Sequence, residues 1–288
     1  MNTMYKYNYK FFSQLPEDMY SAYLRKFYKE IMGSRLDLNK PQLLSEKIQW
    51  LKLYDVNPTK VQCTDKLKVR DYCKEHCPEI KFAQVYTSAD AFEKLDFDSC
   101  PKEFVVKCNH ACQVHVFVED KDDFLKNFDF QKIHWNKLLT QNYAYNSYFE
   151  MQYKDIERKL FVEEFIRNNN EQVGYFEYRV NCFNGEPKFI ELFVKDKVAF
   201  FDLDWNKLDI GYKYHPNLDE EKIVKPKYLD KMIEYSKKLS KDFKFVRVDM
   251  YEHNDDVYLS EMTFTPFSGF IQYNSPEWDT KFGKWLTI

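Results

Sequence analysis

The chain has 288 residues, with 43 Lys and Arg against 46 Asp and Glu, so its formal net charge is -3. This balance excludes the broad cationic surface of a nucleic-acid-binding protein, and the length indicates one large domain or two coupled ones. No apolar run approaches the roughly 18 residues of a membrane-spanning helix. Because the first residues lead into no apolar stretch and the seven cysteines are an odd number, we expect a cytoplasmic protein with reduced thiols.

The first half of the chain predicts mostly helices. We expect short helices around Pro16 and Gly33, a helix capped by Ser45 and broken at Asn57-Pro58, and a helix from Thr64 to His76. A strand at 82–86 and a helix that starts at Thr87-Ser88 and runs to Leu95 should follow. We then expect strands at 104–107 and 114–118 and a helix within 122–142.

The second half predicts strands around one long helix. We expect strands at 160–166, 175–183 and 187–193 with an Asn184-Gly185 turn, a helix at 227–243, and a final hairpin of strands 245–251 and 257–264. Because hairpins and helices are interspersed along the chain, we predict the α+β class.

The final hairpin carries the most informative polar residues. Side chains alternate along a strand, so Arg247 and Asp249 share one face of the first strand, and Glu261 and Thr263 share one face of the second. If the two faces coincide, the cluster suits Mg²⁺ that carries a phosphate. The alternative is a solvated sheet face with a cross-strand pair between Arg and Glu.

Other residues have a structural and a chemical interpretation. Cys108, His110, Cys112 and His115 could form a zinc site, but the spacing lacks the tight Cys-x-x-Cys knuckle, which favours buried, inert thiols. His110 is either an acid/base or a structural histidine. The Tyr-rich stretch at 142–153 has two interpretations: its rings stack on bases or sugars, or they pack between helices. We favour packing between helices. No P-loop, Rossmann or serine-hydrolase motif occurs.

An ordered series of segments points to a known family. The Arg-x-Asp of one strand and the Glu-x-Thr of the next are similar to the nucleotide-binding end of ATP-grasp enzymes. The further segments are 46–55, 65–70, 104–110, 150–154, 163–165, 182–185 and 202–206, followed by 245–249 and 261–266. Together they resemble the TupA-like ATP-grasp family, which is associated with teichuronopeptide and other surface-polysaccharide gene sets. The resemblance covers the chain from about residue 40 onward.

The resemblance implies a nucleotide site. Lys107 would contact the adenine side and the α-phosphate, and Lys66 resembles the first ATP-grasp lysine, with Lys68 and Arg70 as competing candidates. The remaining implied contacts are Glu163, Glu164, Phe165 and Ile166 at the adenine edge, Glu177 at the ribose, and Lys195 or Arg179 at phosphate.

The resemblance also implies roles in catalysis and metal binding. Asp249 and Glu261, with Thr263, would hold Mg²⁺, while Arg247 and Arg179 would act as catalytic residues by orienting the carboxylate or acyl phosphate. Two positions depart from the family pattern. Ala111-Cys112-Gln113 replaces the usual Gly-Ser-Gly phosphate loop, and Thr263 replaces the usual Asn.

We therefore expect an ATP-grasp fold that uses ATP and Mg²⁺. The expected segments are a helical N-terminal part at 1–60 and an ATP-grasp domain at 61–288, with lobes at about 61–158 and 159–288. The expected function is a carboxylate–amine ligase of surface-polysaccharide synthesis that uses a small-molecule or sugar-acid acceptor and an amine, with glycosyltransferases as possible partners. The alternatives are an ATP-grasp kinase and a non-catalytic nucleotide- or glycan-binding partner.

Overall fold

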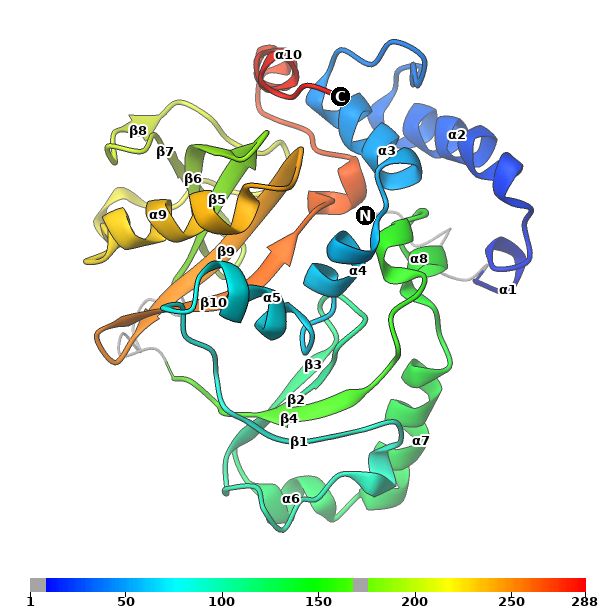
Figure 1. Ribbon diagram of the computed structural model, residues 1–288, viewed down its shortest axis with the longest axis vertical. Helices are drawn as coiled ribbons and strands as arrows, with labels where there is room; N and C mark the ends of the chain where they lie inside the picture. Colours follow the sequence, from blue (N-terminus) through cyan, green and yellow to red (C-terminus); the bar gives the residue numbers. More distant parts are fainter. Residues whose placement is uncertain (1–8, 168–175) are drawn as a thin grey trace.

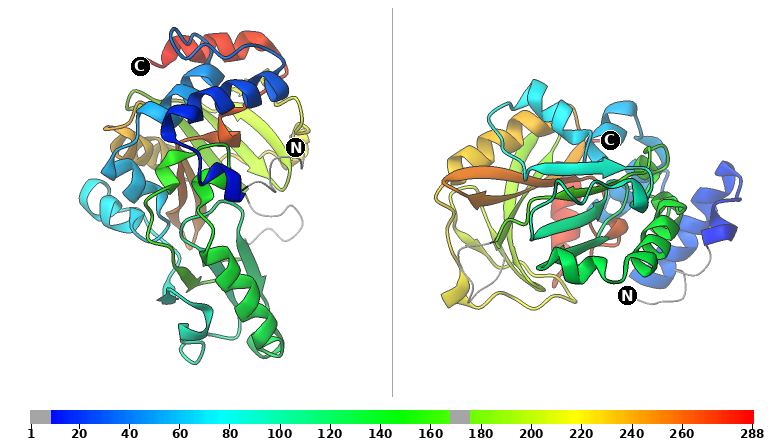
Figure 2. Two further views of the ribbon diagram at one scale, coloured as in Figure 1. Left: turned by 90° about the vertical axis from the view of Figure 1, so that its right-hand side faces the viewer. Right: turned by 90° about the horizontal axis from the view of Figure 1, so that it is seen from below.

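Two antiparallel sheets organise the computed structural model, which describes residues 9–167 and 176–288 (Figure 1). The small sheet, in the order β1-β4-β2-β3, consists of β1 (Val85–Ala89), β2 (Phe104–Cys108), β3 (His115–Val118) and β4 (Leu160–Glu163). The large sheet, in the order β10-β9-β5-β6-β7-β8, consists of β5 (Phe176–Phe183), β6 (Glu186–Val194), β7 (Lys197–Phe201), β8 (Lys207–Leu208), β9 (Phe245–His253) and β10 (Asp256–Thr263). Figure 2 shows the small sheet projecting from the body that holds the large sheet. The predicted α+β class is confirmed.

The helices pack around both sheets. They are α1 (Tyr9–Phe12), α2 (Tyr20–Met32), α3 (Leu44–Tyr54), α4 (Pro58–Thr64), α5 (Val69–His76), α6 (Lys121–Leu125), α7 (Phe128–Leu139), α8 (Tyr143–Asn146), α9 (Leu229–Ser240) and α10 (Pro276–Trp285). Helices α9 and α5 contribute to the apolar core on one face of the large sheet, and α3 and α10 contribute to the core on the other. Helix α7 lies against the small sheet (Figure 1).

Alternation of side chains gives the large sheet two different faces. Val246, Val248 and Met250 of β9 are buried in the core that includes residues of α9. The residues between them, Arg247 and Asp249, therefore point to the opposite face. That face is apolar beneath α3 and α10 and polar farther along the strands.

Several element predictions were wrong in detail. Helix α3 begins at Leu44, and the Ser45 hydroxyl donates to Asp279 instead of capping the helix. Helix α3 ends at Tyr54, before Asn57-Pro58, which instead starts α4, because the Asn57 side chain accepts a hydrogen bond from the Lys60 amide. The predicted helix at 64–76 is divided because Asp65 adopts an extended backbone.

The strand predictions also needed correction. Thr87 and Ser88 lie in β1 rather than at a helix start, and β4 ends at Glu163 instead of residue 166. Strands β7 and β8 were missed. The predicted start of a strand at Tyr175 lies outside the described residues. Strand β4 follows the predicted lobe boundary at 158–159, yet it pairs with β1 and β2 of the small sheet.

Candidate active site

The register of β9 and β10 brings four predicted residues onto one face of the large sheet. Glu261 lies opposite Asp249, and Thr263 lies opposite Arg247. A bulge at Ser260, between Leu259 and Glu261, creates this register. If Ser260 were paired regularly instead of bulged, Glu261 would share a face with Leu259 and would turn toward the apolar core.

Arg247 and Asp249 form a buried, two-pronged ion pair. Arg247 Nε donates to Asp249 Oδ1 at 2.7 Å, and Nη2 donates to Oδ2 at 2.6 Å. The Asp249 side chain is 0% exposed. Burial raises the pKa of Asp249 against the opposing effect of Arg247. Burial would lower the pKa of Arg247, but Asp249, Glu191 and Tyr212 together raise it. The pair is therefore a rigid unit that keeps the guanidinium charged.

Glu261 is the more accessible of the two carboxylates, with 26% of its side chain exposed. Its Oε1 accepts from Thr263 at 2.7 Å, and its Oε2 lies 3.5 Å from Lys66 Nζ. Burial would raise the pKa of Glu261, but Lys66 and Arg247 lower it to about 2. Burial would likewise lower the pKa of Lys66, but Glu261 raises it. Glu261 is thus anionic and Lys66 cationic at neutral pH.

Arg179 extends the cluster from β5, where it lies opposite Asp249. Its Nε donates to Glu177 Oε2 at 2.6 Å, and the guanidinium lies 3.8 Å from the centroid of the Phe193 ring. Glu177 Oε1 also accepts from Ser260 at 2.8 Å. The structure therefore brings Glu177 and Arg179 together with the residues of the final hairpin.

A second charged group lies on the small sheet. Glu163 of β4 forms ion pairs with Lys107 of β2 and, at 3.4 Å, with Arg70 of α5. His115 lies opposite Lys107 on β3. Burial lowers the pKa of His115, and both Lys107 and Lys66 lower it further. Lys66 links the two charged groups, because its Nζ lies 3.5 Å from Glu261 Oε2 and its backbone amide donates to the carbonyl oxygen of Asn109, just after β2.

The segment after β4 lies against the small sheet. Glu164 exchanges hydrogen bonds with Gln84, and the Phe165 ring lies 5.1 Å from the ring of Phe117. Ile166 is half-buried. Lys195 is different, because it lies exposed in the turn between β6 and β7 and forms no hydrogen bond or ion pair with the cluster in the described structure.

The loop that replaces Gly-Ser-Gly follows β2. Lys66 Nζ donates to the carbonyl oxygen of Ala111 at 3.0 Å, which ties the loop to the Lys66 segment. Gln113 has a φ of 58°, a left-handed conformation that glycine adopts without strain. The loop therefore keeps a glycine-like backbone at its third residue without a glycine.

Of the residues weighed for a zinc site, Cys108 and His110 are buried, whereas Cys112 is half-buried. Burial raises the pKa of Cys108 to about 12 and lowers that of His110 to about 4. His110 Nδ1 lies 3.2 Å from Asn109 Oδ1. Across residues 9–167 and 176–288, no group of three or more His, Cys, Asp or Glu side chains is placed to hold a metal.

The donor set has the chemistry that Mg²⁺ requires, and Glu261 is the carboxylate that would be most open to it. Mg²⁺ in proteins is usually held by one or two carboxylates together with phosphates and water. Glu261 offers a partly exposed anionic carboxylate, and the Thr263 hydroxyl lies beside it. Asp249 has both oxygens bonded to Arg247 but keeps unused lone pairs.

Residues that the sequence did not indicate complete the site. Glu191 of β6 lies opposite Arg179, and its Oε1 accepts from Asn181 and from Tyr212, each at 2.8 Å. Its Oε2 is buried and has no hydrogen-bond partner among the residues that the structure describes. Because Glu191 lies in a strand without a recognised motif, only the sheet register could have revealed it.

The two antiparallel sheets, with Lys66 linking their charged groups, fit the ATP-grasp fold. The model of the TupA-like ATP-grasp family matches residues 46–287, and the chain belongs to that family. No curated protein matches the chain. None of the described helices is both long and apolar enough to cross a bilayer.

Solved structures with a similar arrangement have low sequence identity. D-alanine–D-alanine ligase from Bacillus anthracis, complexed with ATP, is 18% identical with a TM-score of 0.42, covering 70% of this chain and 54% of that one. The Helicobacter pylori D-alanine–D-alanine ligase is 17% identical with a TM-score of 0.45, covering 84% and 69%. A RimK-domain ATP-grasp protein from Sphaerobacter thermophilus is 10% identical with a TM-score of 0.44, covering 80% and 69%. This chain thus spans about half the length of the Bacillus anthracis enzyme.

Proposed function

We propose that the protein is an ATP-dependent ligase that joins a carboxylate to an amine. The observation that carries the proposal is the cluster of Arg247, Asp249, Glu261 and Thr263, which faces Lys66. A partly exposed anion beside fixed cations suits a metal-bound triphosphate next to a carboxylate acceptor. Membership of the TupA-like ATP-grasp family supports the use of ATP.

In this proposal the nucleotide lies between the two sheets. Lys107 and Lys66 neutralise phosphates, and the segment from Glu163 to Ile166 contacts the adenine edge. Glu177 binds the ribose, and Lys195 would need to move to reach a phosphate. Glu261, Thr263 and Asp249 hold Mg²⁺, which supplies charge neutralisation at the transferred phosphate when bound.

The proposed reaction has two balanced steps. An oxygen of the acceptor carboxylate attacks the γ-phosphorus of ATP, and the bond to the β-phosphate oxygen breaks to release ADP. The amine nitrogen then attacks the acyl carbon, phosphate leaves, and the nitrogen loses a proton as the amide forms. Arg247 and Arg179 orient the acceptor carboxylate and stabilise the negative charge, so catalysis is mainly positioning.

The wider role follows from the family resemblance. We propose a cytoplasmic step of surface-polysaccharide synthesis, with a sugar acid as acceptor and glycosyltransferases as partners. The proposed segments are a helical part at 1–60 and lobes at about 61–158 and 159–288, with β4 of the last segment paired into the small sheet. A second candidate, a nucleotide-binding protein without turnover, is favoured by one observation: Gln113 occupies the left-handed position of the phosphate loop.

Calorimetric titration of ATP, with and without Mg²⁺, tests the proposal. Wild-type protein should bind ATP more tightly with Mg²⁺, and an Asp249→Asn/Glu261→Gln variant should lose that gain. An Asp230→Asn/Glu234→Gln variant on the exposed side of α9 is the matched control. A screen of sugar acids with amines then measures ADP release.

Three outcomes separate the candidates. ADP release that requires both an acceptor and an amine supports the ligase, whereas release without an amine indicates a kinase. Binding without turnover indicates the second candidate. An absence of ATP binding at millimolar concentration would overturn all three.

A further inference from the structure

Lys52 of α3 is a buried lysine that the proposed reaction does not use. Its residue is 1% exposed, and Nζ donates to Gln49 Oε1 and to the Ser268 carbonyl oxygen, each at 2.9 Å. Nζ also lies 5.1 Å from the centroid of the Phe270 ring. Taking a lysine out of water is costly, so these contacts indicate a specific task.

The Ser268 carbonyl belongs to a strained turn. Phe267, Ser268 and Gly269 have φ values of 52°, 53° and 76°, so two non-glycine residues in succession are left-handed. Such residues are energetically unfavourable and persist where the surroundings fix them. Gln49 Nε2 also donates to the Ser268 carbonyl, at 3.2 Å, so α3 fixes the turn with two donors.

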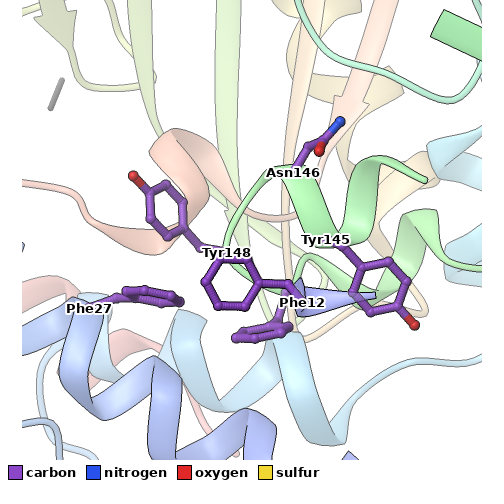
Figure 3. A pocket seen from close by; sticks show the side chains of 6 residues that line it. Phe12, Phe27, Tyr145, Asn146 and Tyr148 are labelled. Atoms are coloured by element: carbon purple, nitrogen blue, oxygen red, sulfur yellow. The ribbon is translucent and has the colours of Figure 1, made fainter. Parts of the chain in front are cut away.

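A second segment fixes the turn from the other side. The hydroxyls of Ser147 and Ser268 lie 2.9 Å apart, and Thr265 donates to Glu150 Oε1 at 2.5 Å. Between Ser147 and Glu150, Tyr148 and Phe149 are also left-handed. These two residues line a small aromatic cavity with Phe12, Phe27, Tyr145 and Asn146 (Figure 3).

The turn continues directly from the proposed metal ligands. Thr265 lies two residues after Thr263, at the end of the segment that carries Glu261. On its far side, the Phe267 ring lies 4.8 Å from the ring of Tyr212, whose hydroxyl donates to Glu191. A shift of the turn would therefore displace Thr263 and Tyr212, which donate hydrogen bonds to Glu261 and Glu191.

We propose that Lys52 is a positioning residue: its two hydrogen bonds hold the turn at 266–269 against α3 and thereby fix the segment that carries Glu261 and Thr263. The inference rests on the proposed function, because the segment matters only if Glu261 and Thr263 serve ATP turnover. The buried carboxylate of Glu150 is the charged group that acts on Lys52. Burial lowers the pKa of Lys52 to about 7, and Glu150 opposes this effect.

The test compares Lys52→Met with Lys47→Met. Lys47 is a matched control, because it also lies on α3 and donates to two backbone carbonyls, those of Gly283 and Leu286, but away from the turn. Amide hydrogen exchange should increase at least tenfold over 263–270 in Lys52→Met and remain unchanged there in Lys47→Met. We also expect turnover to fall at least tenfold in Lys52→Met while ATP affinity changes less than threefold.

Two further readouts separate positioning from general stability. The KM for ATP should stay within threefold of wild type in Lys52→Met while kcat falls, and Lys52→Arg should restore part of kcat. If Lys52→Met does not fold, Gln49→Leu, which removes the second donor, should show the same local exchange at a smaller amplitude.

The outcomes are distinguishable from those for the proposed function. Unchanged exchange over 263–270 in both Lys52→Met and Gln49→Leu would overturn the inference, and so would equal loss of rate in the variants of Lys52 and Lys47. If wild-type protein binds no ATP, the proposed function fails. The exchange measurement still decides whether Lys52 holds the turn.

Discussion

The two sheets hold their charged groups in different ways. On the large sheet, Arg247 and Asp249 lie two residues apart on one strand and neutralise each other in a buried setting. On the small sheet, Glu163 is paired with cations from β2 and α5, and these cations are partly exposed. The first arrangement is fixed by the strand itself, whereas the second joins separate elements.

Because of this difference, we expect substitutions on the two sheets to affect stability and ligand binding to different extents. A buried charge that loses its partner cannot be solvated, so the large-sheet pair should control stability as well as activity. A partly exposed pair is screened by water, so the small-sheet group should affect ligand binding with little effect on folding.

The largest expected effect is at Arg247. Arg247→Met leaves Asp249 buried without a partner, and we expect the free energy of unfolding to fall by about 3–5 kcal/mol, together with loss of turnover. Urea denaturation measures the fall, and the exposed Arg35→Met is the control. The double variant Arg247→Met/Asp249→Leu should regain most of the stability but no turnover. A double variant as unstable as the single one would contradict the buried-pair explanation.

Glu261 sharpens the comparison, because it lies on the large sheet but is partly exposed. Glu261→Gln should lower turnover by roughly 10²–10³-fold, because the anionic ligand is lost. The free energy of unfolding should fall by less than in Arg247→Met, because the ion pairs of Glu261 are partly exposed and screened by water. Steady-state ADP release and thermal denaturation measure the two effects, with the exposed Glu221→Gln as control. A large loss of stability would mean that Glu261 acts as Asp249 does.

His110, just after β2 of the small sheet, is a buried titratable group. Burial lowers the pKa of His110 to about 4 from 6.5, so the unfolded chain binds a proton at a higher pH than the native protein. Stability should therefore fall as pH drops from about 6.5 to about 4, by up to about 3 kcal/mol. Denaturation of His110→Gln across this range should show a smaller fall, whereas the exposed His134→Gln should follow wild type. Parallel curves for wild type and His110→Gln would exclude this contribution.

The smallest expected effect is at Lys107. Lys107→Met should weaken ATP binding roughly tenfold, or about 1.4 kcal/mol. The free energy of unfolding should change by less than about 1 kcal/mol, because Arg70 still pairs with Glu163. Calorimetry measures the affinity, and Lys102→Met, with its exposed partner Asp120, is the control. If Lys107→Met destabilises the protein as much as Arg247→Met does, the two sheets do not differ in the way described.

The local pattern of the sequence determined much of the site. Alternation along β9 separated Arg247 and Asp249 from the buried Val246, Val248 and Met250, and the ordered family segments indicated the ATP-grasp fold. The alternation could be predicted because it depends on neighbouring residues in the chain. The family segments could be predicted because each is a short run of neighbouring residues and the runs follow one another in a fixed order. The sequence allowed two roles for His110, an acid/base or a structural histidine, and its burial favours the structural role.

Only the tertiary structure decided which charges meet. The bulge at Ser260 sets Glu261 opposite Asp249, and the register of β5 and β6 adds Glu191. The hydrogen bond from Lys52 to the Ser268 carbonyl joins residues 216 positions apart. Strand register and burial depend on the packing of distant segments, so no local pattern in the sequence could determine these contacts.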